Sequence, residues 1–352
     1  MRPYDERVLV CDEMIKHPRG DLRMQALRSA SPWSLGRKST ESSIYECYLE
    51  AIANSYRYVY IENQFIISST SKDIPVENKI IKALFMRILK AHEANEPFKV
   101  IIFLPLLPAF EASLEEQQGK VMQIQITLEN KTIGVGENSL IQKLAEALRN
   151  SNLNPEDYLL VCGLRTWEFR PSDMKPITEI IYIHSKLMII DDNYLIMGSA
   201  NLNDRSMLGS RDSELAVFVE GPGNKQVFTG YDNIMVNDKI HEFRVRLFEE
   251  HFGFKIDYPT APNSWLQMRQ TASTNARIYS EVFKVYPDNQ YKTFEALAKR
   301  NKDFDPRKFE AEISRVQGHA VLYPYEFLSQ EKVLETKNSE LSMLAVPLFA
   351  LT

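Results

Sequence analysis

The sequence is poor in cysteine, with only three among its 352 residues. Cys11, Cys47 and Cys162 lie far apart and form no CxxC spacing, so neither a disulfide framework nor a zinc site is predicted, and no metal is expected. The first residues lack the apolar stretch of a secretory signal. The longest apolar run, residues 100–110, is too short to span a bilayer and is interrupted by two prolines. These absences predict a cytoplasmic protein whose membrane contact, if any, is peripheral.

The chain also lacks an excess of positive charge. It has 42 Lys+Arg against 47 Asp+Glu, a formal net charge of −5. This balance argues against a protein that binds nucleic acid mainly through bulk charge, although it leaves room for a local basic patch, and no nucleic-acid partner is expected. With 44% hydrophobic residues, the length allows one large α/β domain or two ordinary ones with a well-buried core.

Apolar runs rich in Val, Ile and Tyr recur along the first two thirds of the chain. They scarcely alternate with polar residues, which is typical of strands buried on both faces. Segments with helical spacing of apolar residues, such as 81–89 and 140–148, separate several of them. We therefore predict an α/β fold, with a mixed, largely parallel sheet sandwiched by helices. The expected strands are residues 58–68, 99–106, 158–165, 180–190, 194–199 and 215–219.

The same patterns divide the chain into three parts. Residues 20–255 are predicted to form one compact catalytic lobe, preceded by a linker or remnant at 1–20. Residues 256–352 show helical patterns and are expected to pack back on the lobe as an extension. Within the lobe, the polar, Gln-rich segment 111–137 is predicted to be a long loop or insertion.

The most informative chemistry lies at residues 181–191. If this stretch is a strand, His184 and Lys186 point to the same face, about 7 Å apart along the chain. An unpaired lysine is costly to bury, and an anionic ligand would remove that cost. Asp191 ends the same predicted strand, where it could accept a hydrogen bond from an imidazole and fix its tautomer.

A turn that follows supplies further donors. Ser199 offers its hydroxyl, Asn201 its amide and the Gly198–Ser199 backbone its N–H groups, which together suit an oxyanion such as phosphate. The alternative is structural: a lone histidine on an apolar strand is more often a core residue, and a lysine at a strand end commonly extends into solvent.

The complete spacing H-x-K-x4-D-x6-G-S-x-N, from His184 to Asn201, resembles the signature of the phospholipase D superfamily. Residues 180–214 closely resemble the eukaryotic, animal-type phosphatidylcholine-hydrolysing enzymes, in particular their C-terminal catalytic half. The resemblance implies that Glu62, Asn63 and Gln64 line the active-site pocket, although this triplet alone could equally cap the next element. Other similar stretches are residues 25–29 with Trp33, 60–65, 136–139, 163–166 and 346–348.

The chain departs from the family pattern at two places. Trp167 stands where relatives commonly carry a histidine, and residues 349–352 lack the tryptophan usual before the last threonine. Arg28 and Arg165 lie in similar stretches, but isolated arginines are more often surface charges. The resemblance supports an anion-binding or structural pairing role for them only modestly.

The resemblance implies phosphodiester transfer by two His-Lys-Asp motifs, one histidine attacking phosphorus and the other serving as acid and then base. His184 would be the acid/base, and no metal or other cofactor would be required for the chemistry. None of the other five histidines has a lysine two residues later, so a second motif is absent from this sequence. They are His17, His92, His241, His251 and His319.

The leading hypothesis is thus a phospholipase D half that hydrolyses phosphatidylcholine-type lipids to phosphatidic acid at a membrane surface, where phosphoinositides could activate the full-length enzyme. Its expected partner is an N-terminal half carrying the missing motif, which makes the chain a fragment nearly inactive alone. One alternative is a homodimeric phosphodiesterase, in which a second copy supplies the histidine. Another is a non-catalytic lipid- or protein-binding remnant.

Overall fold

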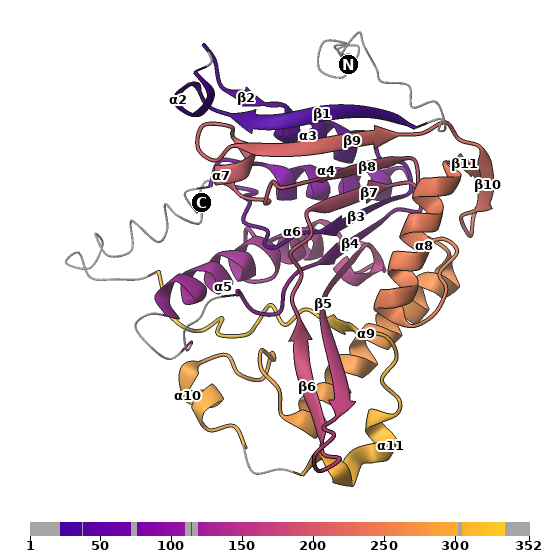
Figure 1. The fold of residues 1–352 in the computed structure, drawn as a ribbon. Helices are drawn as coiled ribbons and strands as arrows, with labels where there is room; N and C mark the ends of the chain where they lie inside the picture. The colour runs from indigo at the N-terminus through magenta and orange to yellow at the C-terminus, as the bar shows by residue number, and fades with distance from the viewer. Residues whose placement is uncertain are drawn as a thin grey trace.

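The computed structural model describes residues 22–36, 38–71, 76–109, 114, 119–301 and 305–334. Its centre is a ten-stranded mixed sheet with the order β12-β5-β4-β3-β7-β8-β9-β1-β2, in which β6 pairs with β5 (Figure 1). A separate hairpin is formed by β10 (Lys225–Phe228) and β11 (Asn233–Val236). The strands of the large sheet are β1 (Arg23–Ala30), β2 (Glu41–Ser42), β3 (Tyr58–Glu62), β4 (Lys99–Phe103), β5 (Leu159–Phe169), β6 (Pro176–Ile181), β7 (Leu187–Ile190), β8 (Tyr194–Gly198), β9 (Glu214–Glu220) and β12 (Ala320–Leu322).

The predicted α/β fold with a mixed sheet between helices is confirmed. Parallel pairing is confined to β3–β4 and β4–β5, so it describes the middle of the sheet and not most of it. These strands are separated in sequence by α4 (Ile80–Glu93), α5 (Lys120–Ile133) and α6 (Leu140–Ala147), and such crossovers permit parallel neighbours. In contrast, three residues join β7 to β8, and a connection that short permits only an antiparallel hairpin.

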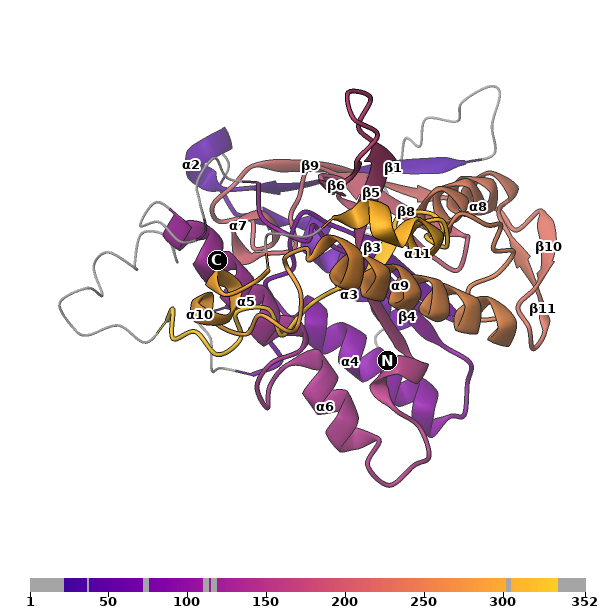
Figure 2. The same cartoon turned by 90° about the horizontal axis from the view of Figure 1, so that it is seen from below.

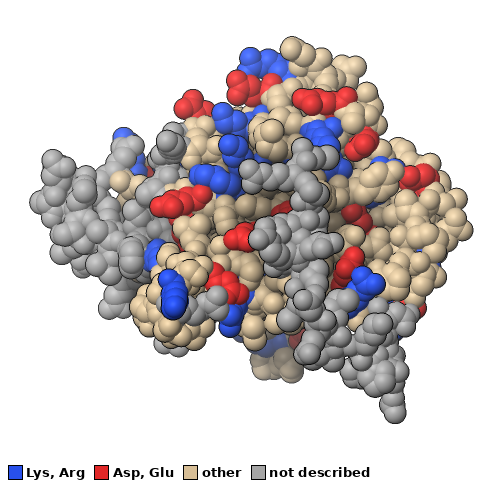
Figure 3. All heavy atoms as spheres, turned by 90° about the horizontal axis from the view of Figure 1, so that it is seen from above, with Lys and Arg blue, Asp and Glu red and all other residues tan. Residues whose placement is uncertain are grey.

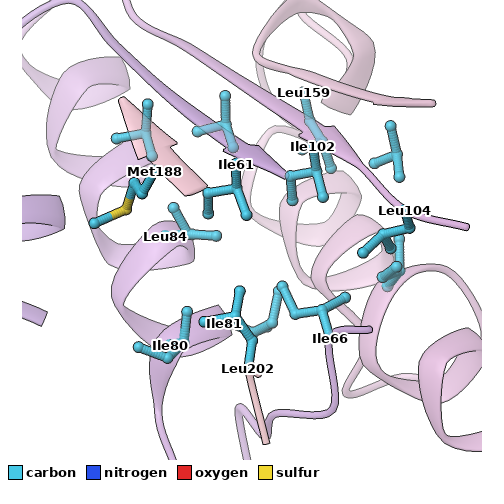
Figure 4. Packing of buried hydrophobic residues seen from close by; sticks show 14 of the residues in the cluster. Ile61, Ile66, Ile80, Ile81, Leu84, Ile102, Leu104, Leu159, Met188 and Leu202 are labelled. Atoms are coloured by element: carbon cyan, nitrogen blue, oxygen red, sulfur yellow. The ribbon is translucent and has the colours of Figure 1, made fainter. Parts of the chain in front are cut away.

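Helices cover both faces of the sheet and bury its alternating side chains. Ile61 of β3 lies with Ile102 of β4 and Leu84 of α4 in one core, which also includes side chains of α3 (Ser43–Asn54) and α6 (Figure 4). Tyr60, which points the other way from the same strand, packs on Phe248 of α8 (Asp238–Phe252). Each such buried apolar side chain contributes about 1.5–3 kcal/mol, which fixes the register that places it on its own face of the sheet.

The segment after residue 255 shares both cores. The first half of α9 (Pro262–Phe283) contributes Trp265 to the α8 side, and its second half contributes Ile278 to the opposite side. Figure 2 shows α9 lying across this edge of the molecule, where β12 pairs with β5. Residues 256–301 and 305–334 therefore complete the sheet as well as adding helices, including α10 (Phe294–Ala298) and α11 (Glu310–Ile313). The predicted linker at 1–20 and the tail motifs at 346–348 and 349–352 lie outside the described residues.

The prediction of a loop at 111–137 is wrong for the part that the structure describes, where α5 occupies Lys120–Ile133. Polar residues on its buried side hide the amphipathic pattern. Asn130 Nδ2 donates to the Phe327 carbonyl at 2.8 Å, and the Tyr323 hydroxyl donates to Glu129 at 3.1 Å. Burial raises the pKa of Glu129 to about 8, although hydrogen bonds from Gln125 and Tyr323 oppose the shift.

The 22-residue α9 is the longest helix of the described ranges. Neither it nor another helix within those ranges combines the length and apolarity that crossing a bilayer requires. Figure 3 shows that described Lys and Arg side chains are interspersed with Asp and Glu on the face seen from above. Among the described residues visible there, neither charge sign forms a continuous surface across the molecule.

Candidate functional site

The segments that the sequence singles out meet at one edge of the sheet. β3 ends at Glu62, which pairs with Leu187 at the start of β7. β8 runs antiparallel to β7 and ends at the same edge with Gly198, opposite Ala216 of β9. Residues 62–64, 184–186 and 198–201 are therefore brought together, although they lie far apart in the sequence.

Residues 182–186 do not form the predicted strand. β6 pairs with β5 whereas β7 pairs with β3, so the chain changes partners between them and this segment belongs to no strand. As a result His184 and Lys186 do not share a face: His184 is exposed, whereas Lys186 is only 8% exposed. The lysine instead folds back and donates to the His184 carbonyl at 2.7 Å, which keeps the two residues adjacent.

Lys186 is a buried cation held by neutral groups. Besides the His184 carbonyl, its ammonium donates to Gln64 Oε1 at 2.9 Å. No carboxylate of the described residues forms a salt bridge with it. Burial lowers the pKa of Lys186 to about 8, and the charge of nearby Glu214 only partly opposes the shift. An anion placed here would supply the missing countercharge.

The His184 ring faces the open side of the site. It stacks on Tyr182, with ring centroids 6.3 Å apart and an interplanar angle of 26°. The Tyr182 hydroxyl in turn accepts a hydrogen bond from Gln64 Nε2 at 2.9 Å. Gln64 thus contacts the residues on both sides of the histidine. Because His184 is exposed, it is not the satisfied core histidine of the structural alternative.

Glu62 and Asn63 are buried, and their side chains bond neighbouring groups of the protein. Glu62 is 6% exposed, and its two oxygens are engaged by Ser185, Tyr60 and His251. Burial disfavours its charge, but the hydrogen bonds and charge of these partners outweigh burial and lower the pKa of Glu62. Asn63 is fully buried and bonds the loop after β8, donating to the Ala200 carbonyl at 3.4 Å. Both side chains hold neighbouring loops in place.

Ser199 and Asn201 line the loop after β8. The Ser199 hydroxyl is exposed and donates to Glu214 Oε2 at 2.5 Å, while it accepts from the Leu215 amide at 3.1 Å. Asn201 Oδ1 is buried and has no hydrogen-bond partner among the described residues. A buried polar oxygen without a partner costs about 1–3 kcal/mol, which a ligand or water that donates to it would recover.

Asp191 does not contact the imidazole that the sequence analysis expected. It lies at the opposite end of β7, roughly 16 Å from Lys186 at about 3.3 Å per residue. Its carboxylate accepts the backbone N–H groups of Tyr56, Arg57 and Tyr58 at 2.6, 2.6 and 2.8 Å. Burial raises the pKa of Asp191 to about 6 despite these three donors.

The carboxylate that bonds an imidazole is that of the next residue, Asp192, and the imidazole belongs to His241. Asp192 bonds His241 Nδ1 at 2.7 Å and Arg244 at 2.8 Å, inside the core. Asp191 and Asp192 both have positive φ, of 54° and 55°, and this tight turn sends their side chains in different directions. Sequence spacing alone does not show that turn.

Glu214 is the site residue that sequence reasoning missed as an individual. Its two oxygens accept from the Ser199 and Ser206 hydroxyls at 2.5 and 2.6 Å, and its charge acts on Lys186. The sequence did contain a signal for Glu214, because it is the last residue of the stretch 180–214 that resembles the phospholipase D enzymes. At the start of β9, it lies at the same sheet edge as Gly198.

Three further residues of the similar stretches, Arg28, Arg165 and Trp167, make contacts within the protein. Arg28 bonds Glu41 at 2.8 Å on the surface, and buried Arg165 donates to the Tyr286 carbonyl at 3.0 Å. Trp167, where relatives commonly carry histidine, packs edge-on against Phe169 with centroids 5.4 Å apart. It lies on the β5–β6 hairpin, partly buried against the main core.

Comparison with known proteins matches residues 26–180 and 173–297 to the family described as Phospholipase D. The chain is 37% identical over 327 residues to human Phospholipase D1, covering 88% of this chain and 30% of that protein. It is 38% identical over 291 residues to a Phospholipase D of Phytophthora infestans, covering 79% and 15%. For Phospholipase D zeta 2 of Arabidopsis thaliana the identity is 36% over 289 residues, covering 79% and 27%.

The chain thus spans less than a third of the length of these curated relatives. The family match nevertheless extends over most of the lobe and includes all three segments that meet at the site. The chain belongs to the phospholipase D family.

Proposed function

We propose that this chain is a catalytic half of a phospholipase D that hydrolyses phosphatidylcholine-type lipids to phosphatidic acid and the free head group. The observation that carries the proposal is Lys186, a buried ammonium without a carboxylate partner among the described residues, adjacent to the exposed imidazole of His184. A phosphodiester combines the negative charge that the lysine requires with a leaving alcohol that the imidazole can protonate.

The proposed roles divide between the two half-reactions. A histidine from a second motif attacks phosphorus, the P–O bond to the head group breaks, and His184 gives its proton to the departing alkoxide. His184, now neutral, takes a proton from water, whose oxygen displaces the phosphohistidine and releases phosphatidic acid. Lys186 stabilises charge on the non-bridging oxygens. Asn201, in the loop after β8, offers its side-chain amide as a further donor to these oxygens. This scheme uses no metal.

The missing histidine requires a second lobe, and the sheet offers a surface for one. Three side chains stand in one row across β8, β9 and β1, because Val217 pairs with both Met197 and Ala26. The next row contains Leu215, which is 60% exposed and lies beside Ser199 of the site, and its partner on β1 is exposed Arg28. We define Ala26, Met197, Leu215 and Val217, with Met24 at 52% exposure, as the open sheet face.

This face is mostly apolar and includes the charged pair of Arg28 and Glu41 beside Leu215, and an exposed apolar patch with polar residues at its rim is typical of an interaction site. Because it borders the site on the side of Ser199, we propose that the lobe carrying the other motif covers it. The complete enzyme would then work on a cytoplasmic membrane surface as a peripheral protein, with phosphoinositides as activators of the full-length form. A second copy of this chain is the alternative occupant.

The test is hydrolysis of phosphatidylcholine in mixed micelles by this chain, alone and combined with a separately expressed first-motif half of an animal phospholipase D. We expect activity only in the combination, and its loss in His184→Ala but not in His92→Ala. His92 is a matched control because it bonds Tyr158 at 3.0 Å, away from the site. Full activity of a dimer of the chain alone would favour the homodimer, and turnover unaffected by His184→Ala would favour the non-catalytic remnant.

A further inference from the structure

One residue of the site segment has a role that neither the motif nor the comparisons assign. Ser185 stands between His184 and Lys186, in the segment that belongs to no strand. Its hydroxyl donates to Glu62 Oε2 at 2.5 Å, across 123 positions of sequence. Together with the bonds of Gln64 to Tyr182 and to Lys186, this gives the strand-free segment three side-chain anchors, all from residues 62–64.

Glu62 can anchor Ser185 because its other oxygen, Oε1, is hydrogen-bonded to two buried side chains. Glu62 Oε1 contacts His251 Nε2 at 2.5 Å and accepts from the Tyr60 hydroxyl at 2.5 Å. Tyr60 also lies 3.1 Å from His251 Nε2. All three side chains are almost completely buried, so water does not compete for these bonds.

His251 is fixed in turn by the fold. It occupies the last turn of α8, and its ring lies against Phe103 with centroids 4.6 Å apart. Its carbonyl accepts the His319 amide at 2.7 Å. A buried hydrogen bond to a carboxylate is strong and directional. The position of Glu62, at the end of β3, is therefore set by α8 through His251.

We propose that His251, Glu62 and Ser185 form a positioning relay that holds the backbone between His184 and Lys186 in its productive geometry. The proposal rests on the proposed function for its catalytic consequence, but its geometry does not. None of the three relay residues touches the substrate in this account. Glu62 therefore acts through Ser185 and not as the pocket-lining residue that the family resemblance implied.

The relay makes a quantitative prediction because, among the described residues, Ser185 and His251 both bond Glu62 and form no hydrogen bond with each other. His251→Leu removes the imidazole anchor, and Ser185→Ala removes the bond that this anchor supports. Misplacement of reacting groups by about 1 Å costs up to about 100-fold in rate. We expect each substitution to lower kcat about tenfold, and the double variant to lose about tenfold and not 100-fold, because both disable one unit.

The first experiment is this double-mutant cycle in the combined enzyme, with kcat and KM measured separately. His251→Gln restores a neutral N–H donor and is expected to regain most of kcat, which a purely structural role of the ring would not predict. His92→Leu is the control for loss of a partly buried histidine. Multiplicative losses for His251→Leu and Ser185→Ala, with KM unchanged, would overturn the relay.

The second experiment needs no activity. The Gly198 amide donates to the Lys186 carbonyl at 3.1 Å, so its hydrogen exchange reports the position of the segment. In the chain alone, we expect this amide to exchange at least about tenfold faster in His251→Leu and Ser185→Ala than in His92→Leu. Exchange equal to that of the control would contradict the relay, even if the combined enzyme proved inactive and the proposed function failed.

Discussion

Replacing Asp191 tests whether the aspartate of the motif acts as structure or as chemistry. Asp191 Oδ1 accepts two backbone N–H groups, those of Arg57 and Tyr58, and Oδ2 accepts that of Tyr56. Asp191→Asn keeps one oxygen but turns its NH₂ group towards a backbone N–H group, so that this N–H loses its acceptor. Each buried N–H group without an acceptor costs about 1–3 kcal/mol. We expect a loss of about 2 kcal/mol in the free energy of unfolding for Asp191→Asn, and about 4 kcal/mol for Asp191→Ala.

The assay is urea unfolding followed by circular dichroism and by tryptophan fluorescence, with coincident transitions required. Asp173→Asn is the matched control, because Asp173 forms a salt bridge with Arg170 on the surface, where solvent screens the interaction and its contribution to stability is small. If Asp191→Ala were no less stable than the Asp173→Asn control, the structural assignment of Asp191 would be refuted.

Three further predictions concern charge and the open sheet face. Because the pKa of Lys186 is about 8, the affinity for tungstate, a phosphate mimic, should fall about tenfold per pH unit above 8 by calorimetry, but not in Lys186→Arg; a flat wild-type profile would contradict this. The folded-state pKa of Glu129 is raised from 4.5 to about 8, so its contribution to stability falls as pH rises through that window. The melting-temperature advantage of Glu129→Gln should therefore grow from pH 5 to pH 8, and a constant difference would count against it. Leu215→Glu should weaken association with the first-motif half in biolayer interferometry, whereas Tyr231→Glu on the β10–β11 turn should not; equal affinities would exclude the face.

Local patterns were sufficient for the middle of the fold. The stripe in α4 and the apolar runs of β3 and β4 are continuous in sequence, so their burial could be predicted from spacing. The helix α5 could not, because its buried positions carry Gln125, Glu129 and Asn130. Partners far along the chain satisfy these polar groups, and the sequence does not reveal such long-range pairing.

The site shows the same limit. The spacing of His184 and Lys186 predicted an anion site, but it also implied a strand that the exchange of partners between β6 and β7 interrupts. Asp191 appeared to belong with the imidazole because it is near in sequence, whereas a turn with positive φ carries it away. Glu214 and His251 reach the site through tertiary pairing, for which the sequence gives no local periodicity.

The central claim is that His184 and Lys186 form half of a two-histidine site. It is tested most directly by titrating a fixed amount of this chain with the first-motif half and measuring phosphatidic acid release. The account predicts negligible release from either part alone, a rise that saturates at a 1:1 ratio, and no rise with His184→Ala. Maximal release from the monomeric chain before any addition would contradict it.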